Sequence, residues 1–158
     1  MTVLAGKARS YALTLLRYRG RSEKELRDRL SRKGFSQEEI GETVAYLRAV
    51  GFLDDSALAE DLKRQAITNK LLGFDGARRF MQQRGLSREV IDRSLGYDEE
   101  TEFRNIRKLI EKKQKTVTQY PEPKRTKSLI GFLMRRGYHL GLIRKALKNT
   151  HTDEEMEP

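Results

Sequence analysis

The sequence predicts an all-α protein built from three tandem three-helix repeats, and two observations carry this prediction. Only three prolines occur in 158 residues, and residues that lose little rotamer freedom in helices dominate the chain. One pattern around a glycine occurs three times, at Gly34, Gly85 and Gly137, with separations of 51 and then 52 residues. A period of this size indicates one supersecondary unit used repeatedly. We therefore expect an elongated, curved array that offers surface rather than a deep pocket.

The repeated pattern predicts a tight corner between two helices. In the first copy, Gly34 can adopt the left-handed conformation that ends a helix. Ser36 can cap the following helix, and Glu39 stands where it would complete a capping box. Phe35 and Ile40 flank the cap at the spacing of a hydrophobic staple. The equivalent residues of the other copies are Leu86, Ser87 and Ile91, then Tyr138, His139 and Ile143.

A further helix precedes each corner, so that each repeat has three. In the first repeat this helix spans about residues 7–18, and Ser22 with Glu25 then forms a capping box for the next one. In the second repeat the helix begins at Asp54 or Asp55, and in the third it begins near Asp98. The predicted divisions are residues 1–53, 54–96 and 97–149, followed by an acidic tail at 150–158 that we expect to be disordered.

Two connections stand out between these elements. At Gly51 the chain leaves a helix, and we expect Phe52 and Leu53 to pack back on the first repeat. Residues 114–127 form the longest predicted loop, in which Tyr120 is the best candidate for an exposed aromatic residue that stacks on bases.

The charge of the chain favours an anionic partner. The formal net charge is +10, from 33 basic and 23 acidic residues. The three predicted repeats carry +5, +1 and +8, and the tail carries −4. A strongly basic protein attracts nucleic acid first of all, although a basic protein without such a partner is the alternative.

Several classes of protein are disfavoured by composition. Cysteine is absent, so disulfides and thiolate chemistry are unavailable, as is usual in a reducing compartment. No apolar run approaches the roughly 20 residues that span a bilayer, and the N-terminus lacks a signal core, so we expect a cytoplasmic protein that does not bind membranes.

The sequence offers no basis for catalysis. The two histidines, His139 and His151, stand at a predicted helix cap and in the acidic tail, and no metal-ligand spacing or phosphate loop occurs. Asp54 and Asp55 are adjacent, and adjacent residues of a helix do not face each other, so capping is their expected role. We expect no enzyme, no metal and no cofactor.

Ordered motifs along the chain resemble the bacterial RecX family of regulatory proteins. These motifs are residues 21–27 (RSEKELR), 33–35 (KGF), 51–55 (GFLDD) and 135–138 (RRGY). The resemblance covers about residues 7–149, and it implies three tandem three-helix repeats. It also implies a protein without enzymatic activity that binds the RecA filament on single-stranded DNA and inhibits its ATPase, recombinase and co-protease activities. Such a role belongs to the regulation of DNA repair, recombination and the SOS response.

Basic side chains are the candidates for contact with the filament or with DNA. They lie mainly on the helix that precedes each corner and on the last helix. The candidates are Arg27, Arg32, Lys33, Arg78, Arg79, Arg84, Lys124, Arg125, Lys127, Arg135, Arg136, Arg144 and Lys145. Lys33, Arg84 and Arg136 directly precede the corner glycines, where a cation also offsets the helix dipole by roughly 0.3–1 kcal/mol. Both interpretations of these three positions remain open.

A direct DNA-binding helix-turn-helix protein is the alternative function. In that class the helix after the corner reads DNA, but in the first copy this helix begins with residues 37–42 (QEEIGE), whose acidic side chains would repel phosphate. The favoured reading is therefore a monomeric filament modulator, with RecA as partner and single-stranded DNA within reach.

Overall fold

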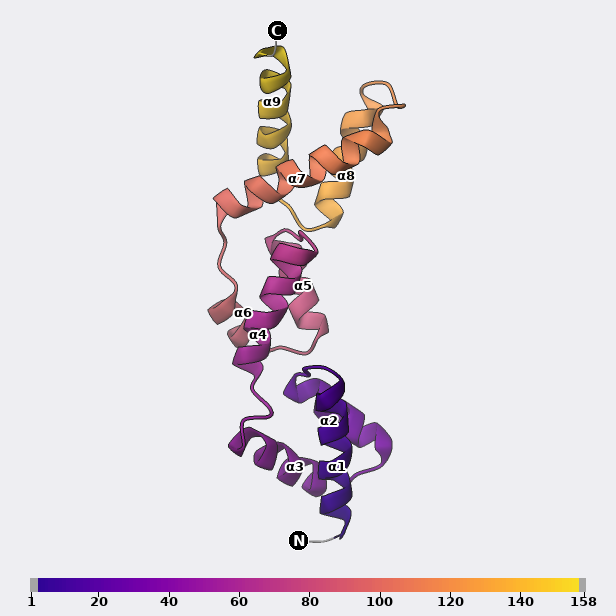
Figure 1. Cartoon of the computed structure of the whole chain (residues 1–158), viewed down its shortest axis with the longest axis vertical. Helices are drawn as coiled ribbons and strands as arrows, with labels where there is room; N and C mark the ends of the chain where they lie inside the picture. The colour runs from indigo at the N-terminus through magenta and orange to yellow at the C-terminus, as the bar shows by residue number, and fades with distance from the viewer. Residues whose placement is uncertain (1–2, 157–158) are drawn as a thin grey trace. The chain divides into compact units, whose positions relative to one another are not determined.

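The computed structural model describes the backbone of residues 3–156 and the side chains of residues 6–149. Every regular element in this part of the chain is helical, which confirms the all-α prediction (Figure 1). In chain order the elements are α1 (Val3–Tyr18), α2 (Glu23–Lys33), α3 (Gln37–Ala49), α4 (Asp55–Arg64), the π-helix η1 (Gln65–Asn69), α5 (Phe74–Gln83), α6 (Arg88–Ser94), α7 (Glu99–Val117), α8 (Lys124–Arg135) and α9 (Leu140–Met156).

The chain forms two compact units. Unit 1 comprises residues 1–62 and 80–94, and unit 2 comprises residues 63–79 and 95–158. Unit 1 thus holds the first predicted repeat with most of α4, the end of α5 and the whole of α6. Unit 2 holds the third predicted repeat with η1 and the start of α5.

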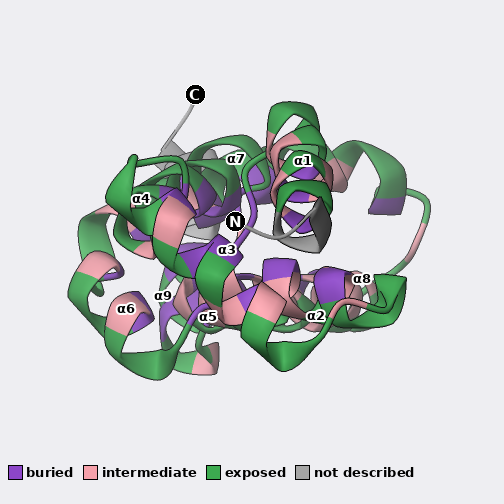
Figure 2. Cartoon of the chain, turned by 90° about the horizontal axis from the view of Figure 1, so that it is seen from below, coloured by how far each residue is buried: buried purple, intermediate pink, exposed green. Residues whose placement is uncertain are grey.

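The core of unit 1 is built by the apolar faces of the first three helices. Each helix buries one side and exposes the other (Figure 2). The buried residues of this core are Ala8, Ala12 and Leu15 of α1, Leu26 and Leu30 of α2, Ile40, Val44 and Leu47 of α3, and Leu53. Because the buried positions recur at helical spacing, removal of their apolar surface from water holds the three helices together.

The core of unit 2 repeats this arrangement with α7, α8 and α9. Its buried residues are Leu71, Ile106, Leu109, Ile110, Val117, Leu129, Leu133, Tyr138, Leu142, Ile143, Ala146 and Leu147. Leu71 precedes α5 and packs among residues of the third repeat, so the unit is larger than that repeat alone.

All three predicted corners are present. Gly34, Gly85 and Gly137 have φ angles of +101°, +84° and +96°, in the left-handed region that glycine adopts without steric cost. After each glycine, the next backbone N–H bonds to the carbonyl five residues earlier, at 3.2, 3.3 and 3.2 Å. This pairing is the Schellman arrangement, and it satisfies carbonyls that the helix end would leave unpaired.

Most of the predicted caps are confirmed. Ser22 and Glu25 form the reciprocal capping box, and Asp54 accepts N–H bonds at the start of α4. Ser36 caps α3 through Glu39 N–H at 3.2 Å, but the Glu39 carboxylate receives the Ser36 hydroxyl at 3.0 Å rather than the backbone N–H. The first corner therefore has a capped helix without the reciprocal bond that we predicted.

Two connections and the last helix differ from the prediction. Leu53 packs back with 5% of its surface exposed, but Phe52 is 59% exposed. The predicted loop at 114–127 is shorter, because α7 continues to Val117 and α8 begins at Lys124. Helix α9 continues to Met156, through most of the predicted tail, where glutamates favour helix and no glycine or proline intervenes.

Candidate functional site

In each unit, the arginine that precedes a corner glycine (Arg84 or Arg136) forms a hydrogen bond with a residue distant in sequence. Arg84 Nη2 donates to the Gly20 carbonyl at 2.9 Å, and its Nε donates to the Glu25 carboxylate at 3.4 Å. Arg136 Nε donates to the Leu71 carbonyl at 3.4 Å. The two carbonyl bonds join residues 64 and 65 positions apart. These candidates therefore have an internal role that neither the dipole nor the partner-binding interpretation anticipated.

Leu71 shows why the second of these contacts is needed. Its φ angle is +52°, a left-handed conformation that costs a branched residue roughly 1–2 kcal/mol. Its carbonyl accepts bonds from Arg136 and from the Tyr138 hydroxyl, the latter at 2.7 Å. Burial raises the pKa of the Tyr138 phenol well above its ordinary value, so this donor keeps its proton. The corner of the third repeat thus stabilises the turn before α5.

Lys33, the counterpart in the first repeat, has no such carbonyl partner. It is exposed, and its Nζ lies 5.4 Å from the centre of the Tyr11 ring. A cation–π contact at an exposed site contributes only about 0.5–1 kcal/mol, so this ammonium group remains available to a partner.

Arg27 and Lys145 form surface ion pairs with Glu23 and Glu99, at 3.6 and 3.4 Å. Pairs of this kind contribute about 0–1 kcal/mol and exchange readily with other anions. Both cations therefore remain candidates for binding.

The cations predicted in a loop instead form the first turn of α8. Arg125 donates to the carbonyls of Tyr120 and Thr118, at 3.1 and 3.2 Å, and Lys124 Nζ lies 4.5 Å from the centre of the Tyr120 ring. Tyr120 is half-buried against the unit 2 core, so the prediction that it is exposed for stacking is wrong. Lys127 is exposed, and its side chain forms no ion pair with the described residues.

Other candidates lie at the surface without an internal ion pair among the described residues. Arg32 on α2, Arg79 on α5, Arg135 on α8 and Arg144 on α9 are exposed in this way. Arg78 differs, because it is partly buried and already has an interaction partner.

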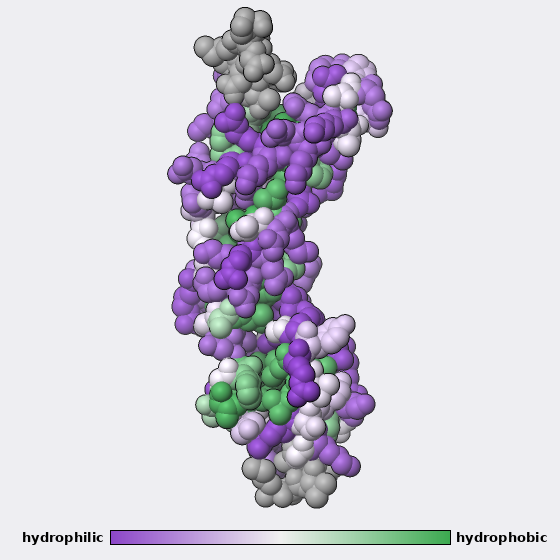
Figure 3. All heavy atoms as spheres, in the orientation of Figure 1, coloured by the Kyte–Doolittle hydropathy of each residue, from purple (hydrophilic) through white to green (hydrophobic). Residues whose placement is uncertain are grey.

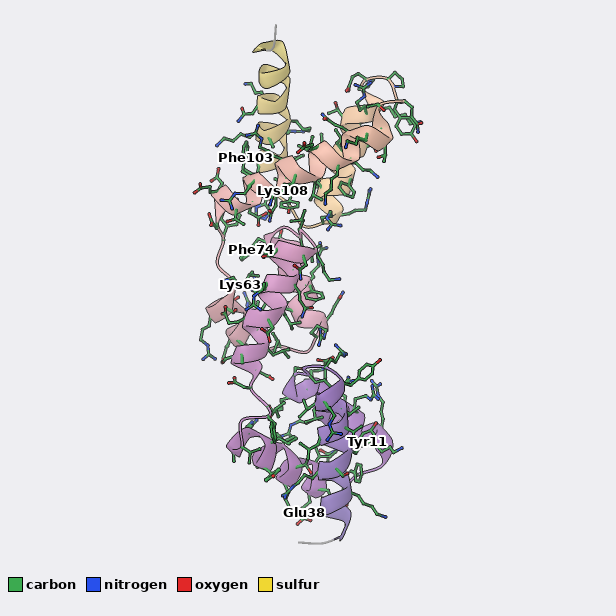
Figure 4. All side chains as sticks on the ribbon, viewed as in Figure 1. Tyr11, Glu38, Lys63, Phe74, Phe103 and Lys108 are labelled. Atoms are coloured by element: carbon green, nitrogen blue, oxygen red, sulfur yellow. The ribbon has the colours of Figure 1, made fainter. Side chains whose placement is uncertain are left out.

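The exposed face of α7 adds a group of cations that the sequence analysis missed. Arg104, Lys108 and Lys112 are spaced by four residues, and Lys115 follows on the same side. All four are exposed, and Lys108 is labelled in Figure 4. Their spacing of four residues is the signal that could have identified them, since it places side chains on one face about 6 Å apart.

A groove of about 310 Å³ in unit 1 gathers further cations, and we call it the basic groove. Its basic residues are Arg19, Arg21, Lys24, Arg29 and Arg32, and Gln82 and Gln83 line it as well. Two acidic residues also line it, but Glu25 is paired with Arg19 and Arg84, and Asp28 is paired with Lys24. The uncompensated charge is therefore positive, on Arg21, Arg29 and Arg32.

Unit 2 holds a buried carboxylate that supports structure. Glu102 is 7% exposed, and its Oε1 accepts the Phe74 N–H at 2.6 Å, which caps the start of α5. Burial raises the pKa of Glu102 to about 7, although the Phe74 bond and His139 oppose the increase. The His139 Nε2 lies 3.0 Å from the Asp75 carboxylate. The ring also stacks on Tyr97, at 5.9 Å between centroids.

The described part of the chain contains no group of three or more acidic or histidine side chains arranged to hold a metal ion. Within the same residues, no helix has the length and apolar character needed to cross a membrane.

Family models match at both ends of the chain. Residues 8–47 match the model described as "RecX, first three-helix domain", and residues 100–147 match "RecX, third three-helix domain".

Curated relatives and solved structures agree with these matches. The chain is 34% identical over 141 residues to "Regulatory protein RecX" of Chlorobaculum tepidum, covering 89% of this chain and 86% of the relative. It is 30% identical to the protein of the same name from Amycolatopsis mediterranei, covering 90% and 82%. The crystal structure of RecX from Lactobacillus salivarius superposes with a TM-score of 0.81 at 18% identity, over 92% of this chain and 96% of that one, which shows the fold. A second structure, of "regulatory protein RecX", gives 0.78 at 25% identity, over 90% and 72%.

Proposed function

Since the chain belongs to the RecX family of regulatory proteins, we propose that it binds the RecA filament on single-stranded DNA and lowers its ATPase, recombinase and co-protease activities. In this proposal it is a cytoplasmic regulator of DNA repair, recombination and the SOS response. It acts as a monomer by binding rather than by catalysis. The relatives described above carry the name of a regulatory protein, which supports that reading.

The observation that carries the proposal is the set of exposed cations whose side chains form no ion pair within the part of the chain that the structure describes. They occur in both units, on α2, α7, α8 and α9, and the formal charge of the chain is +10. Cations that are not needed to hold the fold are available for an anionic surface, and a nucleoprotein filament offers phosphates and carboxylates together. Arg84, Arg125 and Arg136 are removed from this set by their internal bonds.

The first test is a titration of RecA-catalysed ATP hydrolysis on single-stranded DNA, at fixed salt and with DNA in excess. We expect inhibition at well below one protein per RecA monomer. Inhibition that requires saturation of the DNA sites would instead indicate competition for DNA, and the proposal would fail.

A double variant on α7 tests whether this helix contacts the filament. Lys108→Glu with Lys112→Glu reverses two exposed charges on α7, and we expect at least a tenfold rise in the concentration that halves the ATPase rate. Lys7→Glu makes the same kind of change at an exposed position of α1 that is not among the candidates, and should alter that concentration by less than twofold.

Direct DNA binding remains the second candidate, and one observation supports it in the third repeat. Helix α9 follows its corner and exposes Arg144 and Lys145, whereas α3 follows the first corner and exposes Glu38 and Glu42. Charge-reversal at Arg144 that abolishes a sequence-selective interaction with duplex DNA would favour this function over the filament.

A further inference from the structure

Unit 1 has an apolar groove that the proposed function does not explain. Its volume is about 610 Å³, and we define it by Leu13 and Leu16 of α1, Ala57 and Leu58 of α4, and Phe52 between α3 and α4. Apolar atoms gather over the α3–α4 connection in Figure 3. An exposed apolar hollow with polar surroundings is typical of a site for another molecule.

The exposure of Phe52 indicates that this groove binds another molecule. The neighbouring Leu53 packs into the core with 5% exposed, which already anchors the connection. Phe52 leaves 59% of its surface in water, so it contributes far less to folding than a buried phenylalanine would. A large ring held at the edge of a groove is instead suited to cover an inserted apolar side chain.

The groove also has a charged border, in which Arg17 and Arg21 stand beside Asp54 and Asp61, so the excess positive charge comes from the adjoining basic groove. Arg17 is exposed and has no internal ion pair among the described residues. Of the two acidic residues, Asp54 already accepts the N–H groups of Ser56 and Ala57 at 3.1 and 3.2 Å, and Asp61 already has an interaction partner.

Arg21 joins the apolar groove to the basic groove, because its side chain lines both. It is 9% exposed, and its Nε donates to the Leu15 carbonyl at 3.3 Å. Burial lowers the pKa of the Arg21 guanidinium, and the nearby charges of Arg19 and Arg29 lower it further. The repulsion from Arg19 and Arg29, which adds to the larger effect of burial, would be relieved by an anionic group placed between the two grooves.

We propose that the two grooves together bind an acidic segment of a partner protein, which inserts an apolar side chain beneath Phe52 and directs its carboxylates toward Arg17, Arg29 and Arg32. Complementary charge and a preformed apolar hollow are the usual elements of peptide recognition. Single-stranded nucleic acid fits less well, because Leu13, Leu16 and Leu58 are aliphatic and the groove offers one aromatic platform rather than several.

A phage-displayed library of random peptides, selected against the full-length chain, tests this proposal without RecA. Enriched peptides are expected to combine an aromatic or aliphatic residue with several aspartates or glutamates. A synthetic peptide of the enriched sequence is then titrated by fluorescence anisotropy. The outcome of this peptide assay is independent of the outcome of the ATPase titration, because the peptide assay contains no RecA filament.

Two variants and two controls test whether the peptide binds in the two grooves. Phe52→Ala and Arg32→Glu are each expected to weaken peptide binding at least tenfold. Tyr18→Ala removes an aromatic side chain that is 86% exposed and outside the grooves, and Lys7→Glu reverses a charge on α1. Both controls should change binding by less than twofold, and thermal unfolding followed by circular dichroism checks that all four variants fold.

The proposal is overturned if selection enriches no acidic peptide, or if Phe52→Ala binds the enriched peptide as tightly as the parent chain. It is also overturned if Phe52→Ala loses affinity for an oligothymidine while peptide binding is unchanged. That result would assign the grooves to nucleic acid.

Discussion

Replacing the corner glycines with alanine separates the cost of backbone strain from the cost of close packing. All three glycines have a left-handed φ angle. An alanine Cβ would meet nothing within 4 Å at Gly34, but would lie 2.5 Å from Ser22 Oγ at Gly85 and 2.0 Å from the Gly76 nitrogen at Gly137. The strain is therefore shared by the three positions, whereas the steric clash is not.

The expected magnitudes follow from this difference. Left-handed alanine costs roughly 1–2 kcal/mol, so Gly34→Ala should lower the free energy of unfolding by about that amount. At Gly137 the neighbour is backbone and cannot rotate away, and overpacking adds about 1–3 kcal/mol, for a total of roughly 2–5 kcal/mol. Gly85→Ala should fall between them, because the Ser22 hydroxyl can move but would lose its cap to Glu25, which is worth about 0.5–2 kcal/mol.

Urea unfolding followed by helical ellipticity measures these values, and comparison of the m-values checks that the transition remains the same. The loss of stability should be smallest for Gly34→Ala, larger for Gly85→Ala and largest for Gly137→Ala. Equal losses at Gly34 and Gly137 would refute the close packing of the third corner against the start of α5.

Three further predictions concern single side chains. Arg136→Ala should lower the free energy of unfolding by about 1–3 kcal/mol, because the Leu71 carbonyl loses one donor. Arg135→Ala should change it by less than about 0.5 kcal/mol. Thermal melts of the two variants test this difference. The folded-state pKa of Glu102 is raised from 4.5 to about 7, so protonation of this side chain favours folding. The stability of the parent chain relative to Glu102→Gln should therefore fall as the pH rises from 4.5 to about 7. A difference in stability between the two that stays constant from about pH 4 to 8 would contradict the burial of Glu102. Asp54→Ala should cost about 0.5–2 kcal/mol through the lost α4 cap, and a melting temperature equal to the parent's would argue against that cap.

The corners could be predicted from sequence because their signals are local. Gly34, Gly85 and Gly137 each precede an apolar residue and end a helix through bonds made within six residues. Ser22 and Glu25 are three residues apart, and their capping box depends on nothing more distant. Short-range geometry of this kind is fixed before tertiary packing is considered.

The roles of the basic residues could not be predicted in the same way. Arg84 and Arg136 bond to carbonyls more than sixty residues away, and no local pattern shows that such a carbonyl is near. The sequence predicts a loop as far as residue 127, but α8 begins at Lys124 and brings the Arg125 side chain to the Tyr120 carbonyl. The candidate set therefore mixed structural arginines with exposed ones.

Two further outcomes depended on tertiary packing. Phe52 and Leu53 are both apolar and adjacent, and only the fold decides which of them points into the core. Glu102 stands four residues before Ile106, on the side of α7 that becomes buried, and this spacing was the available signal for its burial.

The central claim is that the exposed cations recognise a RecA filament rather than bare DNA. The most direct measurement compares binding of the labelled chain to single-stranded DNA coated with RecA and to the same DNA uncoated, at equal salt and nucleotide concentration. We predict binding at least tenfold tighter to the coated DNA, and a loss of that preference in the variant with Lys108→Glu and Lys112→Glu. Equal affinity for coated and bare DNA would contradict the claim and favour the direct DNA-binding function.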